Sequence, residues 1–149
     1  MAPSTAVVWF RRDLRVHDHP ALAEAVREFD RVVPLFVFDP ELLGGRFRSH
    51  NRTAWLRGAL QALDGELRER GGRLVIRHGR PETKVCAVAR DAGARAVYVS
   101  DDVTAFARNR DGRVAEALER DDVELRRRPG LWVADDLDAI RTGQGTPYT

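Results

Sequence analysis

One short apolar run constrains the fold of this chain more than any other feature. Residues 6–10 read Ala-Val-Val-Trp-Phe, and charged residues follow them at once. Strands of antiparallel sheets usually alternate apolar and polar side chains, because one face of such a sheet meets water. An unbroken apolar strand is typical of a parallel sheet that helices cover on both faces. The run therefore predicts a buried strand inside an α/β fold.

Further strands and helices alternate along the chain. Apolar runs at residues 32–38, 74–76 and 96–99 predict three more strands, and the alternating residues 123–125 predict a short fifth strand at an edge. Helical spacing between them predicts a first helix from Pro20 with a stripe of Leu22, Val26 and Phe29, and a second over about residues 51–70. A third helix opens at Pro81, a fourth follows residue 104, and residues 41–48 form a loop. This alternation predicts a doubly wound, Rossmann-like α/β fold whose five-stranded parallel sheet has the order 3-2-1-4-5 or 2-1-3-4-5.

The composition limits the kinds of partner. A chain of 149 residues makes one domain that can bury a core. Its 25 Lys and Arg nearly balance its 23 Asp and Glu, and the resulting net charge of +2 is poor evidence for direct nucleic-acid binding. Its one cysteine, Cys86, excludes an internal disulfide. No apolar stretch approaches the roughly 20 residues of a membrane span, and no signal peptide is evident, so we expect a cytoplasmic protein.

Polar residues gather where the predicted central strands end. Those that follow the first, second and fourth strands are Arg11, Arg12, Asp13, Asp39, Asp101, Asp102 and Thr104. Ligands of open parallel sheets bind at the carboxyl ends of the strands, where the strand order reverses. Phe10, Val37 and Phe38 could provide an apolar wall for a planar ligand there, although Val37 and Phe38 taken singly are more often core residues. The sequence therefore predicts a cleft for a flat heteroaromatic ligand.

The same stretch carries a family resemblance. Residues 9–22 read Trp-Phe-Arg-Arg-Asp-Leu-Arg-Val-His-Asp-His-Pro-Ala-Leu, and this long, ordered motif closely resembles the opening of the photolyase/cryptochrome family. Residues 35–40, 109–114 and 145–149 fall where that family has similar stretches. The resemblance extends over essentially the whole chain but only over the family's amino-terminal third. It implies the strand order 3-2-1-4-5, an α/β domain over residues 1–130, and a linker over residues 131–149 that leads to an absent helical domain.

The resemblance also implies a light-harvesting role. In photolyases this domain often holds an antenna chromophore, which is a deazaflavin, a folate or flavin mononucleotide. The chromophore passes excitation to a reduced FAD in the helical domain, and that FAD splits pyrimidine dimers in DNA. Arg11, Asp39, Arg52 and Asp102 match positions of deazaflavin-binding relatives. Many folate- and deazaflavin-binding members carry glutamate at the position of Thr104. Its absence counts most against folate, because that carboxylate is a natural acceptor for the pterin amino group. The resemblance therefore favours 8-hydroxy-5-deazaflavin or flavin mononucleotide, with an empty site as the alternative.

Three functions are therefore in contention. The first is the light-harvesting domain of a deoxyribodipyrimidine photolyase, and the second is the same domain of a cryptochrome-like photoreceptor. The third is a free-standing nucleotide-binding α/β domain. We expect the chain alone to be inactive in DNA repair, because its resemblance implies a helical FAD-binding domain as partner and DNA contact only through that parent. We predict no catalytic residue and no metal ligand, since His17 and His19 lack a third ligand nearby.

One charge interrupts the apolar side of the fourth predicted helix. Arg110 lies between Phe106 and Val114 at helical spacing. A guanidinium in that position needs a counter-ion if the helix face is buried. We therefore expect Arg110 to be buried beside a carboxylate such as Asp13 or Asp102.

Overall fold

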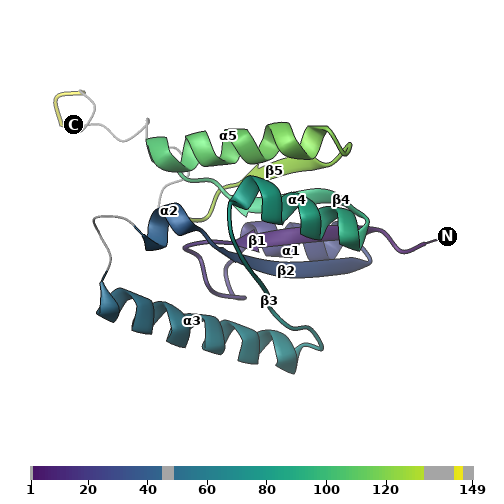
Figure 1. Ribbon diagram of the computed structural model, residues 1–149, viewed down its shortest axis with the longest axis horizontal. Helices are drawn as coiled ribbons and strands as arrows, with labels where there is room; N and C mark the ends of the chain where they lie inside the picture. Colours follow the sequence, from purple (N-terminus) through teal and green to yellow (C-terminus); the bar gives the residue numbers. More distant parts are fainter. Residues whose placement is uncertain (1, 45–48, 133–142, 146–149) are drawn as a thin grey trace.

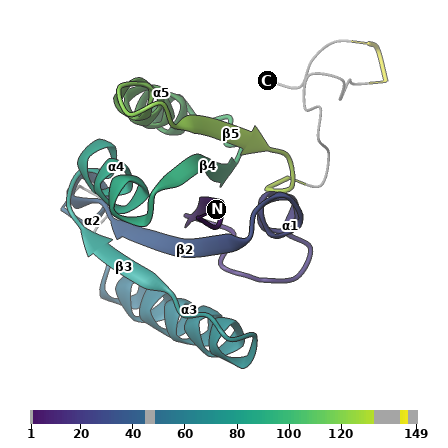
Figure 2. The same ribbon diagram turned by 90° about the vertical axis from the view of Figure 1, so that its right-hand side faces the viewer.

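The computed structural model describes residues 2–44, 49–132 and 143–145. Its strands are β1 (Thr5–Phe10), β2 (Arg31–Phe38), β3 (Val75–His78), β4 (Ala94–Ser100) and β5 (Glu124–Arg128). They form one parallel sheet in the order β3-β2-β1-β4-β5, with β1 in the middle (Figure 2). The predicted class and the order 3-2-1-4-5 are both confirmed.

Five helices surround the sheet in the described part of the chain. They are α1 (Pro20–Glu28), α2 (Pro40–Leu43), α3 (His50–Glu69), α4 (Pro81–Ala92) and α5 (Ala105–Glu119) (Figure 1). Helices α4 and α5 cover one face of the sheet, while α1 and α3 lie on the other (Figure 2). The fold is doubly wound, because the crossovers place helices on both faces.

The alternation of side chains along β1 divides the core into two clusters. Val7 and Trp9 pack with α4 and α5, whereas Ala6, Val8 and Phe10 pack with α1 and α3. Every residue of β1 is buried. The unbroken apolar run is thus explained by a central strand whose two faces both lie under helices.

Helix α1 buries a different stripe from the one its sequence predicts. Val26 is 61% exposed, whereas Ala21 and Ala25 are fully buried against the sheet. Leu22 and Phe29 lie at the border of the same cluster and are partly buried. Two alanines four residues apart let the helix approach the strands closely, which turns the larger Val26 toward solvent.

Local signals account for how several elements begin. His19 caps α1, since its Nδ1 accepts a hydrogen bond from the Leu22 N–H at 3.1 Å, and Pro20 is the first helical residue.

Pro34 lies within β2, but β3 pairs with β2 only from Leu35 onward. This stretch of β2 therefore has β1 as its only neighbouring strand, and the missing N–H of Pro34 is tolerated there.

Residues 41–48, expected to be a loop, begin instead with the short helix α2. Asp39 caps it by accepting the Glu41 N–H at 2.9 Å, and Pro40 is its first residue.

Cys86 is free and buried on α4, and burial raises the pKa of its thiol. No helix within the described ranges has the length and apolarity needed to cross a bilayer. Most of the expected linker over residues 131–149 lies outside the described residues.

Candidate functional site

A cleft of about 390 Å³ opens at the carboxyl ends of the central strands. Its floor and walls come from β1, β2, the segment after β4, and the first turns of α4 and α5. It lies where the sheet order reverses between β1 and β4, which is the usual ligand position in this class of fold. Helix α2 stands at the same end of the sheet (Figure 1), and its Leu42 reaches the cleft.

Most of the predicted site residues lie on this cleft. Those that line it are Phe10, Arg11, Arg12, Val37, Asp39, Asp102 and Thr104. Their convergence follows from the parallel sheet, whose strands all end at one edge. Whether they bind a chromophore stays a prediction.

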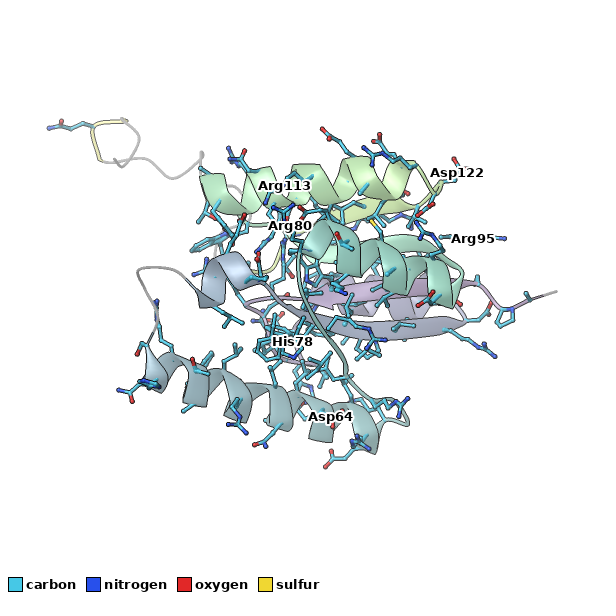
Figure 3. The ribbon with its side chains drawn as sticks, in the orientation of Figure 1. Asp64, His78, Arg80, Arg95, Arg113 and Asp122 are labelled. Atoms are coloured by element: carbon cyan, nitrogen blue, oxygen red, sulfur yellow. The ribbon has the colours of Figure 1, made fainter. Side chains whose placement is uncertain are left out.

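Four predicted residues are not among the lining residues. Asp13 is buried below the loop after β1, and Phe38 turns to the opposite face, where its ring stacks on His78 with centroids 4.7 Å apart. His78 lies between the sheet and α3 (Figure 3). Arg52 is exposed on the first turn of α3. Asp101 is exposed, and its backbone N–H donates to the Arg128 carbonyl at 2.8 Å.

Aromatic residues from both core clusters line the cleft, and they include residues that the sequence did not indicate. The Phe10 side chain belongs to the cluster on the α1 side, with its ring 5.0 Å from that of His19. Trp9 has the opposite orientation and lies on the cleft side with Phe106 of α5. Phe106 is 39% exposed, so its ring is available to a ligand. Trp9 was not predicted to line the cleft, because an unbroken apolar run does not show which side chains of a strand lie on which face of the sheet.

Two arginines share one buried carboxylate beside Trp9. Arg11 donates to Asp111 Oδ1 and to the Ser100 carbonyl, while the Nε of Arg110 donates to the same Asp111 oxygen at 3.2 Å. Both guanidinium groups lie over the Trp9 ring, with their central carbons 4.8 Å and 5.2 Å from its centroid. Burial lowers the pKa of Arg110, and the charge of Arg11 acts in the same direction.

This arrangement corrects the expected partner of Arg110. The side chain is buried as predicted, but its counter-ion is the adjacent Asp111, and neither Asp13 nor Asp102 forms an ion pair with it. Asp13 is held elsewhere and Asp102 pairs with Arg12, with 3.3 Å between Arg12 NH1 and Asp102 Oδ2. Asp111 could be recognised in the sequence as a candidate counter-ion, because it is adjacent to Arg110. Its contact with Arg11 could not be recognised, because the two residues lie 100 positions apart.

Asp102 and Thr104 organise the rim beside α5. Burial by itself would raise the pKa of Asp102, but hydrogen bonds from the Thr104 N–H and from Arg12 outweigh it and lower that pKa. The Thr104 hydroxyl accepts the Ala107 N–H at 3.2 Å and so caps α5. Arg12 is more than half exposed and lies 5.9 Å from the Trp132 ring. The rim therefore offers one accessible cation.

Asp39 has an oxygen that the protein does not use. Its Oδ1 accepts the Glu41 N–H, whereas its Oδ2 is buried without a hydrogen-bond partner among the described residues. The residue is 5% exposed and lines the cleft. An unsatisfied buried carboxylate oxygen is unfavourable, so this position needs a donor from outside the described chain.

Asp13 supports the loop that carries the arginines. Its Oδ2 accepts the Ser100 hydroxyl and lies 2.7 Å from His19 Nε2, and its Oδ1 accepts the Arg11 N–H at 3.4 Å. Burial alone would raise the pKa of Asp13, but its contacts with His19 and Ser100 outweigh burial and lower that pKa from 3.8 to about 2. Asp13 thus fixes the end of β1 to β4 and α1 and leaves the cleft to its neighbours.

Three helices are joined above the cleft by weak ion pairs. Arg113 lies on α5 (Figure 3), and two of its guanidinium nitrogens lie 3.8 Å from carboxylate oxygens of Glu41 on α2 and of Glu82 on α4.

The cleft also has lining residues that were not predicted from the sequence, namely Trp9, Phe36, Leu42, Pro81, Phe106, Ala107 and Arg110. The alternation along β1 could have indicated Trp9, whereas the α4 and α2 residues reach the cleft only through the packing of the helices.

A comparison with protein-family models identifies this architecture. Residues 6–149 match the DNA photolyase model. The chain belongs to the DNA photolyase family. Among curated relatives, it is 45% identical to the deoxyribodipyrimidine photo-lyase of Streptomyces griseus over 122 residues, which are 82% of this chain and 27% of that protein. It is 42% identical to the cryptochrome DASH of Natronomonas pharaonis, with 97% of this chain and 32% of that protein covered. The chain thus spans about a third of these relatives.

Solved photolyase structures share the fold. A bacterial class III photolyase from Agrobacterium tumefaciens superposes with a TM-score of 0.84 at 26% identity, covering 99% of this chain and 30% of that one. An archaeal photolyase from Sulfolobus tokodaii, solved with two FAD molecules, gives a TM-score of 0.78 at 32% identity. That match covers 84% of this chain and 29% of the archaeal chain. This chain is therefore similar to the amino-terminal part of DNA photolyase family members.

Proposed function

We propose that this chain is the light-harvesting domain of a deoxyribodipyrimidine photolyase and that its cleft binds a flat antenna chromophore. The observation that carries the proposal is the buried Oδ2 of Asp39, which has no hydrogen-bond partner among the described residues and lies on a cleft with aromatic lining. A ring N–H of the ligand would satisfy this oxygen. The cleft volume of about 390 Å³ lies within the range of about 300–1,000 Å³ common for small-molecule sites.

Each part of the cleft has a role in this proposal. Trp9 and Phe106 would contact the faces or edges of the ring, and Asp39 would accept its N–H. Arg12, exposed at the rim, would contact a polar or phosphorylated tail. When bound, the pigment would supply absorption in the visible range and pass its excitation onward.

The residues at the rim favour a flavin or deazaflavin over folate. Thr104 uses its hydroxyl oxygen to cap α5 and offers no carboxylate to a pterin amino group. The photolyase of Sulfolobus tokodaii was solved with two FAD molecules, with the implication of a novel light-harvesting cofactor, and this supports a flavin as a candidate here. We therefore propose 8-hydroxy-5-deazaflavin or flavin mononucleotide as the chromophore of this chain.

A reconstitution experiment tests the pigment site. The 149-residue chain is mixed separately with 8-hydroxy-5-deazariboflavin, flavin mononucleotide, methenyltetrahydrofolate and ATP, and binding is followed by absorption and fluorescence. We expect a flavin or deazaflavin to bind, and Asp39→Asn to weaken that binding about tenfold or more, because the amide presents a donor toward the ring N–H. Asp91→Asn, an exposed change on α4, is the matched control. Binding of ATP with no pigment would favour the free-standing nucleotide-binding domain.

The activity of the whole protein is part of the same proposal. We propose that the parent chain adds a helical domain that binds FAD and contacts DNA, and that light absorbed in the cleft drives dimer repair there. Because the chain is also similar to a cryptochrome DASH, a cryptochrome-like photoreceptor is the second candidate for the parent protein. Repair of pyrimidine dimers by the full-length parent under blue light, with a pigment-dependent action spectrum, would support the photolyase. A folded, pigmented parent without repair would favour the photoreceptor.

A further inference from the structure

Arg110 presents donors to the cleft that the described part of the chain leaves unused. Its side chain is 7% exposed, and its Nε donates to Asp111. Its two terminal nitrogens form no hydrogen bond with any described residue, and the guanidinium lies over the rings of Trp9 and Phe106. Buried guanidinium groups normally find acceptors for most of their N–H groups. The donors on the terminal nitrogens of Arg110 are therefore open to an acceptor that a ligand brings into the cleft.

The local charge balance indicates the same kind of ligand atom. Asp111 is the shared ion-pair partner of Arg11 and Arg110 among the described residues, and the charge of Asp102 also acts on Arg110. Arg11 also donates to the Ser100 carbonyl, whereas Arg110 has no second acceptor among the described residues. An oxygen with negative charge or strong polarity would be stabilised beside Arg110.

Arg110 and Asp39 offer complementary hydrogen-bonding groups to a ligand in the cleft. Within the described ranges, Oδ2 of Asp39 at the end of β2 has no donor, and the terminal nitrogens of Arg110 on α5 have no acceptor. Both line the same cleft, together with Trp9 and Phe106. We infer that Arg110 determines ligand specificity by binding a ring oxygen of the chromophore, while Asp39 binds an N–H of the same ring. This inference rests on the proposed function and limits the ligand to planar rings that carry both a carbonyl or hydroxyl oxygen and an N–H.

The test compares Arg110→Met with Arg108→Met in the 149-residue chain. Methionine keeps an unbranched apolar stem near Trp9 but removes the charge, and Arg108 is exposed on the same helix. Riboflavin and 8-hydroxy-5-deazariboflavin serve as probes, because both have ring carbonyls and neither has a phosphate that the rim arginines could bind. Loss of a charge-assisted hydrogen bond should weaken probe binding roughly ten- to hundredfold in Arg110→Met and leave Arg108→Met unchanged.

Infrared spectroscopy separates ligand contact from a structural effect. A hydrogen bond from a guanidinium weakens the C=O bond, so a ring carbonyl of the bound probe should absorb at lower frequency in the wild type and Arg108→Met than in Arg110→Met. Far-ultraviolet circular dichroism reports whether each variant folds. If Arg110→Met does not fold, Arg110→Lys takes its place, and an intermediate carbonyl frequency is expected because the charge remains with fewer directed donors.

Several outcomes would overturn this inference. Equal affinity and equal carbonyl frequency in the wild type and the Arg110 variant would do so and leave the proposed function intact. A strong preference for flavin mononucleotide over riboflavin that Arg110→Met abolishes would also do so, because the phosphate rather than the ring would then contact Arg110. Failure of the wild-type chain to bind any flavin, deazaflavin or folate would overturn the proposed function together with this inference.

Discussion

The guanidinium of Arg11, at the end of β1, donates a hydrogen bond to the carboxylate of Asp111, 100 positions later on α5. Both side chains are almost fully buried, at 8% and 2% exposure. This contact joins the central strand to the helix that covers it and fixes a cation at the cleft.

Removing Asp111 should destabilise the domain strongly. Asp111→Ala leaves Arg11 and Arg110 buried without a counter-ion, and breaking a buried ion pair in this way costs about 3–5 kcal/mol. Urea unfolding followed by circular dichroism measures the change. Asp121→Ala is the control, because Asp121 pairs with the exposed Arg90 and its loss should cost less than about 1 kcal/mol. Similar losses in the two variants would contradict the structural role of Asp111.

Asp13 should make stability depend on acidic pH. Its pKa is 3.8 in the unfolded reference state and about 2 in the folded chain, so its stabilisation is complete above about pH 4 and is lost as the pH falls toward 2. The difference between these two pKa values corresponds to about 2 kcal/mol of unfolding free energy. Unfolding free energies of the wild type and Asp13→Asn, measured from pH 6 to pH 2, should therefore converge by about this amount at the acid end. Parallel curves would show that Asp13 is not responsible.

Charge reversal on α5 should distinguish a buried from an exposed arginine. Arg110→Glu would place a second buried carboxylate against Asp111, whereas Arg113 is 45% exposed and only 3.8 Å contacts link it to Glu41 and Glu82. We expect a loss of more than about 3 kcal/mol for Arg110→Glu and less than about 1 kcal/mol for Arg113→Glu. Thermal and urea unfolding measure both. The reverse order would contradict the placement of α5.

Two neighbouring residues of α1 should respond oppositely to a change in size. Ala25 is fully buried against the sheet, so Ala25→Leu should overpack the core and cost about 1–3 kcal/mol or more. Val26 is 61% exposed, and Val26→Leu should change the unfolding free energy by no more than about 0.5 kcal/mol. Urea unfolding of both variants tests which face of α1 contacts the sheet. A greater loss of unfolding free energy for the Val26 variant would show that Val26 faces the sheet, as the sequence predicts.

The sequence of α1 shows why such faces are hard to predict. Leu22, Val26 and Phe29 have the right spacing for a buried stripe, yet Ala21 and Ala25 are the residues that face the strands. Helical periodicity identifies a set of larger apolar side chains, while close packing against a sheet favours small ones. The existence and start of the helix were predictable from His19 and Pro20, because capping depends on neighbouring residues.

The candidate site was predictable in position but less so in composition. Arg11, Arg12, Asp39, Asp102 and Thr104 reach the cleft because they directly follow strands that end at one edge of the sheet. Asp13 follows the same strand but is held below the surface by Ser100 and His19. The difference depends on contacts between distant segments, and no local pattern specifies them.

The apolar run at residues 6–10 and the alternation of strands and helices were enough to place a buried strand in a parallel α/β sheet, because both faces of such a strand must be covered by helices. Periodicity left two strand orders open, and the family resemblance favoured the one observed. The packing of the whole domain was needed to show that Trp9 lines the cleft together with Phe10 and that Asp111 pairs with both Arg11 and Arg110. Those choices depend on which helix covers which face, which is set by packing across the whole domain.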